Sequence, residues 1–109
     1  MARLNPFSER TSISLDAVCY LPTSSVVTDP IGNQTIVRGY RPVFCSELPI
    51  HSAEFFNAGQ QGIKPENLLV IMAEEYSSED NVKYLDRELT IYKTYPRVDG
   101  FIELYCRRR

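Results

Sequence analysis

Residues 82–106 read VKYLDRELTIYKTYPRVDGFIELYC, and this stretch decides the fold class of the chain. Apolar residues occupy every second position along residues 102–106, and residues 88–92 alternate in the same way. Such alternation is typical of strands that bury one face. Turn-forming residues separate the strands around Asp86 and at 97–100. The stretch therefore predicts consecutive antiparallel strands joined by tight turns.

The first half of the chain predicts two more strands. Residues 12–21 alternate, and Ile13, Leu15, Ala17 and Cys19 fall on one face. Residues 22–34 are dense in turn formers, so we expect a turn region there. A long strand follows at Thr35–Leu48. Gly39 and Pro42 inside it indicate a bulge or an edge position, because proline cannot donate to a ladder.

The segment from His51 to Asn67 interrupts this β pattern. Ser52 is a plausible N-cap of a helix, which must be short because Gly59 and Gly62 follow closely. A turn at residues 64–67 then leads into a third strand at residues 68–76. The first half of that strand is continuously apolar, as in a strand buried on both faces.

These elements predict a mainly β protein of five or six antiparallel strands, with one short helix in a long loop between strands 2 and 3. The expected architecture is a small β-barrel or a two-sheet sandwich. All 109 residues fit one domain, with a flexible arm at residues 1–11 and a solvated, partly frayed basic tail at residues 107–109.

Composition excludes several function classes. Twelve basic and fourteen acidic residues leave a net charge of −2, whereas a general nucleic-acid binder shows a basic excess. The longest apolar run, residues 68–73, is far shorter than the roughly 20 residues of a membrane helix, so we expect a soluble protein. Cys19, Cys45 and Cys106 are far apart in apolar runs, and we expect them to be reduced and buried.

No residue pattern indicates catalysis. His51 is the single histidine, and no nucleophile or orienting group can be assigned to it. Gly59 and Gly62 are not a phosphate-binding loop, because no Lys-Ser/Thr pair follows them. Residues 74–80 are acidic but lack the ligand spacing of a calcium loop. We therefore expect a protein that is not an enzyme, with no catalytic residues, cofactor or metal.

Five segments together resemble the phage head–tail joining, or head-closure, family, whose members are head-completion and stopper-type proteins. They are DPIGN at 29–33, RPVFC at 41–45, EFFNAGQQGIKP at 54–65, VKYLDRELTIYKTY at 82–95 and IELYC at 102–106. The resemblance spans residues 12–106. It implies a small β-barrel with a long excursion between its second and third strands.

The same resemblance implies a structural assembly role at the virion head–tail junction, after synthesis in the host bacterial cytoplasm. The subunits would form a ring, a dodecamer, that retains packaged DNA and offers a surface for tail attachment. The implied partners are a portal or adaptor protein above, a tail-terminator or tail protein below, and other copies of the chain. Packaged DNA would lie nearby without specific contact, and no membrane is involved.

Two positions depart from the family pattern. Similar sequences carry an Asn-Gly or Asp-Gly turn after Tyr84, whereas this chain has Leu85-Asp86-Arg87. A type I′ turn prefers glycine, so the sequence argues against a two-residue hairpin there. Lys93 stands where arginine is common, which weakens any bidentate contact at that position.

The excursion supplies the candidate contact segment. Aromatic area, backbone freedom and uncharged hydrogen bonding suit a segment that docks on a partner. The candidate residues are Phe55, Phe56, Gly59, Gln60, Gln61, Gly62, Lys64 and Pro65. The alternatives are that both phenylalanines plug one end of the barrel, or that one faces inward while the other does not.

A different function class is also open. A small β-barrel could bind nucleic acid by stacking bases on strand aromatics, and Tyr84, Tyr92 and Tyr105 are the candidates.

Overall fold

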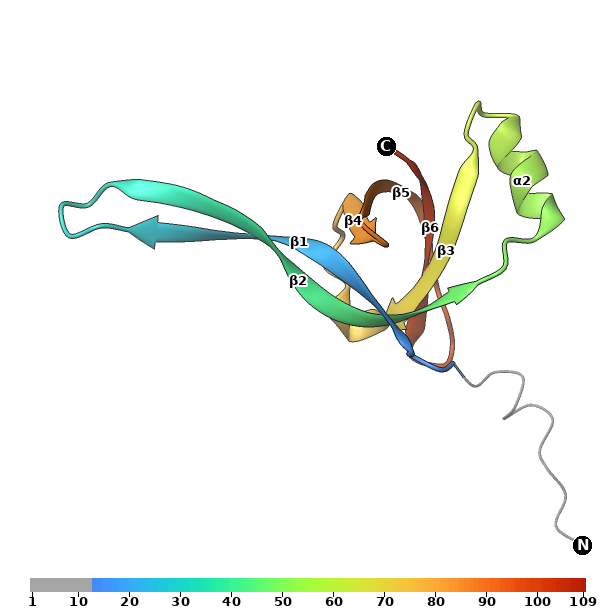
Figure 1. Ribbon diagram of the computed structural model, residues 1–109, viewed down its shortest axis with the longest axis horizontal. Coiled ribbons are helices and arrows are strands. Elements are labelled where there is room, and N and C mark those ends of the chain that lie inside the picture. Colours follow the sequence, from blue (N-terminus) through green and yellow to red (C-terminus); the bar gives the residue numbers. More distant parts are fainter. Residues whose placement is uncertain (1–12) are drawn as a thin grey trace, which may run out of the picture.

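The computed structural model describes residues 13–109 and confirms the expected mainly β architecture (Figure 1). Within this part of the chain, six strands form one closed barrel in the order β1-β2-β3-β6-β5-β4, so the sandwich alternative is wrong. The strands are β1 (Ala17–Thr28), β2 (Gln34–Leu48), β3 (Pro65–Met72), β4 (Asn81–Tyr84), β5 (Arg87–Pro96) and β6 (Phe101–Arg108). Helix α2 (Ser52–Gly59) lies between β2 and β3, and a 3₁₀ turn, η1 (Ala73–Glu75), follows β3. The arm expected at residues 1–11 lies outside the described residues.

Every pair of neighbouring strands is antiparallel. The barrel closes where β1 meets β4, through the partner pair Tyr20 and Lys83. β2 pairs with β3 only through Ser46–Leu48. The rest of β2 therefore has β1 as its single neighbour, and the β1–β2 hairpin extends away from the barrel wall.

The alternating residues fill the barrel interior, as the sequence predicts. The core cluster consists of Cys19, Leu21, Val43, Cys45, Leu69, Ile71, Val82, Tyr84, Leu89, Ile102, Leu104 and Cys106. In β3, Leu68 to Ile71 are all buried, which confirms a strand covered on both faces. The expected burial of all three cysteines is also confirmed.

The turn region expected at residues 22–34 is wrong. β1 continues to Thr28, and only residues 29–33 form the turn to β2. The Asp29 carboxylate closes this turn by accepting hydrogen bonds from the backbone N–H groups of Ile31 (3.0 Å) and Asn33 (2.8 Å). Residues 23–28 are threonine, serine and valine, which favour extended backbone once β2 pairs with them.

Of the two alternatives for Gly39 and Pro42, the edge position is confirmed. The register between β1 and β2 is continuous from Ala17 to Thr28, so no bulge occurs there. Pro42 pairs with Tyr20 and lies outside the part of β2 that bonds to β3. Its missing N–H therefore removes no hydrogen bond to β3.

The objection to a two-residue β4–β5 hairpin is also wrong. Tyr84 pairs with Arg87, and only Leu85 and Asp86 lie between them. Both have positive φ, 52° and 61°, as a type I′ turn requires. Val82 and Leu89 are paired and fully buried, so their packing holds a turn that the loop residues do not favour.

Several boundaries differ from the sequence predictions. The N-cap of α2 is His51, and no side chain caps the helix, so Ser52 is not the cap. β3 begins at Pro65 and ends at Met72, and the expected continuation to residue 76 is η1 instead. Arg107 and Arg108 belong to β6, so the basic tail is exposed but not frayed over those two residues.

Candidate functional site

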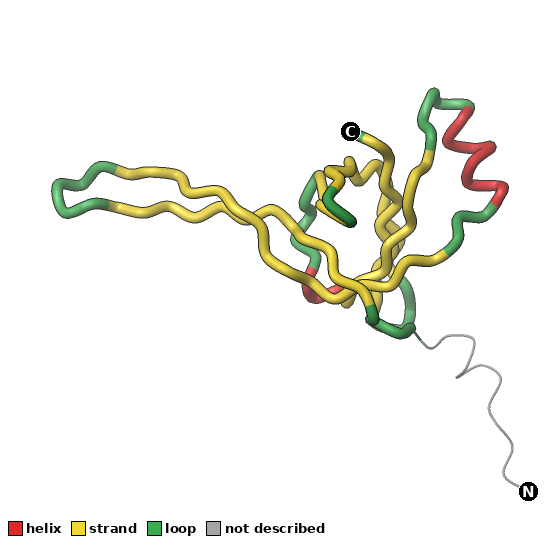
Figure 2. Tube along the Cα trace, in the orientation of Figure 1, coloured by secondary structure: helices red, strands yellow, loops and turns green. Residues whose placement is uncertain are grey.

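The barrel carries two appendages that point in different directions (Figure 2). One is α2 with the turn that follows it, which lies beside β3. The other is the far part of the β1–β2 hairpin, which we call the ribbon (residues 23–40). Each is described in turn because each exposes apolar side chains.

Glu54 fastens α2 to the barrel wall. Its carboxylate accepts a hydrogen bond from the Tyr92 hydroxyl (2.7 Å) and pairs with the Lys93 ammonium group. The Glu54 side chain is only 12% exposed. Burial by itself would raise the pKa of Glu54, but the hydrogen bonds from Lys93 and Tyr92 outweigh it and lower the pKa below its usual range. The carboxylate is therefore a charged anchor between helix and strand.

Lys93 contributes to this anchor in two ways. Its Nζ atom pairs with one carboxylate oxygen of Glu54 while Tyr92 binds the other. The same Nζ atom lies 4.3 Å from the ring centroid of Tyr105, a cation–π contact. Lysine serves here because Tyr92 already occupies the second carboxylate oxygen, so a bidentate guanidinium is not needed.

The end of α2 is a Schellman motif centred on Gly62. The Ile63 N–H donates to the Ala58 carbonyl (2.9 Å), and the Gly62 N–H donates to the Gly59 carbonyl (3.0 Å). Gly62 has φ of 74°, a conformation that suits glycine. The side chain of Ala58 is buried and that of Ile63 half-buried, which supplies the apolar contact usual in this motif. The backbone conformation at the helix end therefore requires glycine at position 62. Gly59 does not have this role, and nothing lies within 4 Å of a Cβ built on it.

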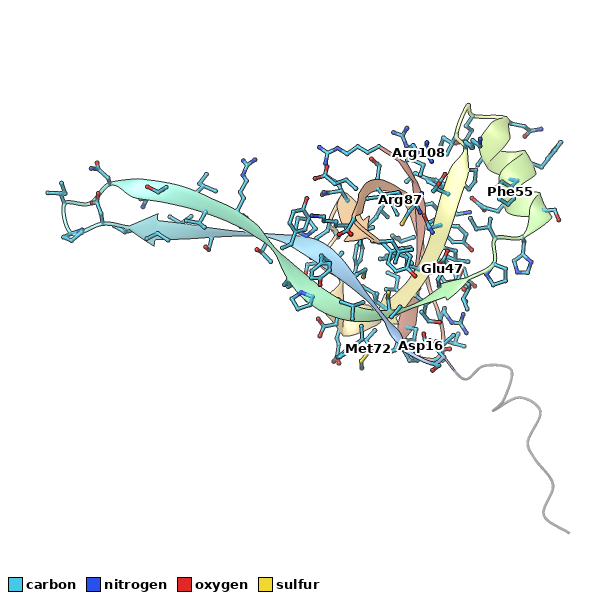
Figure 3. The ribbon with its side chains drawn as sticks, viewed as in Figure 1. Asp16, Glu47, Phe55, Met72, Arg87 and Arg108 are labelled. Carbon is cyan, nitrogen blue, oxygen red and sulfur yellow. The ribbon has the colours of Figure 1, made fainter. Side chains whose placement is uncertain are left out.

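The candidate contact segment places both phenylalanines outward. Phe55 is 46% exposed and Phe56 is 67% exposed, and Figure 3 shows Phe55 on the helix beside the barrel. The alternatives in which both rings, or one of them, plug the barrel are therefore wrong. Gln60, Gln61, Gly62 and Lys64 are also exposed, so the structure gathers the candidates onto one appendage. Pro65 is the exception, because it is buried at the start of β3.

The three tyrosines of the nucleic-acid alternative do not form an open stacking surface. Tyr84 is 5% exposed, and its hydroxyl donates to Glu47 (3.0 Å). Burial and this hydrogen bond raise the pKa of Tyr84 to about 12. Tyr92 and Tyr105 are half-buried, with hydroxyls that donate to Glu54 and to Glu103 respectively. These side chains hold the barrel wall and α2 in place.

Sequence reasoning missed the ribbon. All residues from Thr23 to Tyr40 are exposed, because this part of the hairpin has no third strand beside it. Its exposed aliphatic side chains are Val26, Val27, Ile31, Ile36 and Val37, and Ile31 is 85% exposed. The β-branched pairs Val26-Val27 and Ile36-Val37 are the signal that predicts two strands here, and Val26 is paired with Ile36. Nothing in these residues distinguishes an exposed ribbon from a buried hairpin.

The basic tail pairs with acidic side chains of other strands. Arg108 and Arg87 both contact Glu66, at 3.3 and 2.9 Å, and Arg109 contacts Glu88 at 2.7 Å. Figure 3 shows Arg87 and Arg108 near one end of the barrel. These pairs are largely exposed and contribute little to stability.

Residues 13–109 contain neither a metal-binding cluster nor a membrane-spanning helix. No three side chains of the metal-binding types gather closely enough there to hold an ion. None of the helices in that part of the chain has the length and apolar character needed to span a bilayer.

Comparison with models of protein families finds no match, and comparison with curated proteins finds none either. Among solved structures, the chain is similar to the solution structure of protein SF1141 from Shigella flexneri 2a, a structural genomics target. The two superpose with a TM-score of 0.55 and 18% sequence identity, over 84% of this chain and 90% of that one. At this identity the likeness shows the fold alone.

Proposed function

We propose that this protein is a structural assembly subunit of a tailed phage, a head–tail connector of the head-closure type. In this role, copies form a ring below the portal or its adaptor, retain packaged DNA and offer a surface to the tail. The five sequence segments that resemble the family support the proposal, and a small β-barrel with an excursion between β2 and β3 agrees with it.

The observation that carries the proposal is the exposed phenylalanine pair on an anchored helix. Phe55 and Phe56 together expose roughly 230 Å², taking about 200 Å² for a whole aromatic side chain. Burial of that area in an interface would contribute about 6 kcal/mol. Exposed aromatic side chains of this kind are typical anchors of protein–protein interfaces.

The anchoring of α2 favours a preformed contact surface. Glu54 is fixed by Tyr92 and Lys93, and the Schellman motif at Gly62 fixes the other end of the helix. Binding of a partner to the helix face is therefore opposed by little loss of backbone entropy. The proposed contact is thus made by a surface that already has its binding geometry.

The test uses the phage that encodes this protein. Cells supply either the wild-type subunit or the double variant Phe55→Ser and Phe56→Ser, and Val98→Ser is the control because Val98 is fully exposed on the β5–β6 turn. The proposal expects the double variant to fold normally and to give heads that package DNA but lose it or fail to join tails. Infectious particles at the control level from the double variant would contradict the proposal.

A second observation needs no mutagenesis. Head-completion proteins act between the portal and the tail, so the coding gene is expected to lie between portal and capsid genes on one side and tail genes on the other. A gene that lies among metabolic or regulatory genes would count against the proposal.

A further inference from the structure

The ribbon is an element that the barrel does not need. It contributes no residue to the core cluster, and all of its residues are exposed. An isolated two-stranded hairpin is marginally stable in water and gains stability from a surface that covers it. Its aliphatic side chains lie on both faces, because Val26 pairs with Ile36 on one face and Val37 with Ser25 on the other. The ribbon therefore exposes aliphatic side chains on both of its faces.

The ribbon is poor in charge. The only charged residues among residues 18–40 are Asp29 and Arg38, whereas 24% of the residues in the whole chain are charged. The Asp29 carboxylate is already engaged by two backbone N–H groups of the turn. The tip therefore presents Ile31, which is 85% exposed, without a free charge beside it. Such a tip fits a partner surface that is aliphatic and poor in charge.

The same chain offers a matching surface elsewhere. On the outer wall of the barrel a hollow of about 110 Å³ is lined by Val18, Pro42, Val43 and Phe44, all uncharged. A water molecule has about 30 Å³ of liquid volume, so the hollow has room for an aliphatic side chain. Phe44 is 66% exposed at its rim. We call this feature the Phe44 hollow.

The tip and the hollow of one copy are too far apart to meet. Ten residues of β1 separate Val18 from Thr28, which corresponds to about 33 Å of extended strand. Figure 1 shows the hairpin pointing away from the barrel and not folding back on it. An apolar knob at one place and a complementary hollow at another form a head-to-tail contact between copies, which closes into a ring or continues as a filament.

We propose that Ile31 at the ribbon tip of one copy docks in the Phe44 hollow of a second copy of this chain. The inference rests on the ring assembly proposed above and specifies the contact between its subunits. A tip in a hollow buries much less than the roughly 800 Å² per partner of a standard interface. The free protein is therefore expected to be monomeric or weakly associated, and to form the ring only on a partner surface.

The test is disulfide trapping between two variants of the full chain that each carry one added surface cysteine. Ile31→Cys is mixed with a size-tagged Phe44→Cys at about 200 μM and oxidised, and the mixed dimer is quantified on a non-reducing gel. Phe56→Cys replaces Phe44→Cys in the control, because Phe56 is 67% exposed but lies on α2. The native cysteines are fully buried, so they do not compete in the folded protein.

The inference expects at least ten times more mixed dimer with Phe44→Cys than with Phe56→Cys. Equal yields from the two mixtures would overturn it, and so would Ile31→Cys homodimers as the main product. Unfolding curves of each variant confirm the fold before trapping. Adding Ile31→Asp to the tagged Phe44→Cys chain leaves its hollow intact and should not reduce trapping by Ile31→Cys.

Failure of this inference is distinguishable from failure of the proposed function. Trapping is measured on the purified protein and does not depend on a phage. If Phe55→Ser with Phe56→Ser blocks head completion while no Phe44-specific dimer forms, the function stands and the ribbon contact is wrong. If the dimer forms while the same helix variant assembles normally, the contact stands and the proposed function is wrong.

Discussion

Replacing Glu54 by glutamine tests how α2 is held against the barrel. The substitution keeps the shape of the side chain but removes the charge that pairs with Lys93 and accepts from Tyr92. Hydrogen bonds to a charged group contribute about 1.5–3 kcal/mol. Lys93 is 47% exposed, which reduces its share. We therefore expect Glu54→Gln to lower the free energy of unfolding at pH 7 by about 1–2 kcal/mol.

The pH dependence has a definite sign. The pKa of Glu54 is lowered in the folded protein, because the hydrogen bonds from Lys93 and Tyr92 outweigh burial. The carboxylate thus adds stability that is fully present above the unfolded pKa of about 4.3 and is lost as pH falls through the folded value. Glutamine mimics the protonated acid. The difference between wild type and Glu54→Gln should therefore shrink toward zero in strong acid.

Thermal unfolding followed by circular dichroism at pH 7 and pH 2.5 measures both effects. The expected loss corresponds to about 4–8 °C in Tm at pH 7 for a domain of this size. Glu74→Gln is the control, because Glu74 is exposed on η1, and its Tm should be close to that of wild type. A Tm unchanged by Glu54→Gln at pH 7, or an equal loss at both pH values, would refute the assigned role of Glu54.

Three further predictions follow from single features of the backbone and core. Gly59→Ala should stabilise the protein by about 0.5–1 kcal/mol and Gly62→Ala should destabilise it by about 1 kcal/mol, because of these two glycines only Gly62 has positive φ. Changes in the free energy of unfolding that have the same sign for both variants in urea would contradict this. Leu85→Asn with Asp86→Gly should stabilise the β4–β5 turn by about 0.5–1 kcal/mol, and a lower denaturation midpoint would show that the type I′ geometry is misassigned. The three cysteines should resist thiol reagents at pH 8 until the protein unfolds, because all three are fully buried, and burial also raises the pKa of Cys106 to about 12; rapid labelling of the native protein would exclude this packing.

The barrel could be predicted from the sequence wherever one face of a strand is buried. The alternation at residues 102–106 placed Ile102, Leu104 and Cys106 in the core, and the structure agrees. Residues 23–28 lack this information, because neither face of the ribbon is covered and no apolar period is required. The turn formers after Pro22 therefore dominated the prediction, although only residues 29–33 turn.

The β4–β5 turn shows tertiary packing overriding local preference. Leu85 and Asp86 do not favour positive φ, and their residue types argued against the hairpin. Pairing of buried Val82 with buried Leu89 fixes the register and leaves only two residues for the turn. Such pairing depends on contacts across the barrel and is not visible in the loop itself.

The candidate site was predictable in its residue types but not in its geometry. The sequence indicates that Phe55 and Phe56 are unusual in a polar excursion, yet it does not say whether they face the core or the solvent. The anchor that decides this joins Glu54 to Lys93, which are 39 residues apart. Composition also does not reveal why glycine occupies position 62. The structure shows that its positive φ ends the helix.

We propose that this protein completes the head of a tailed phage through the exposed face of α2. The most direct measurement is an electron cryomicroscopy reconstruction of the head–tail junction of the phage that encodes it. We expect a ring of this β-barrel between the portal or adaptor and the tail, with Phe55 and Phe56 buried against a neighbouring protein. A junction that contains no copy of the chain, or a ring in which both phenylalanines remain in solvent, would contradict the account.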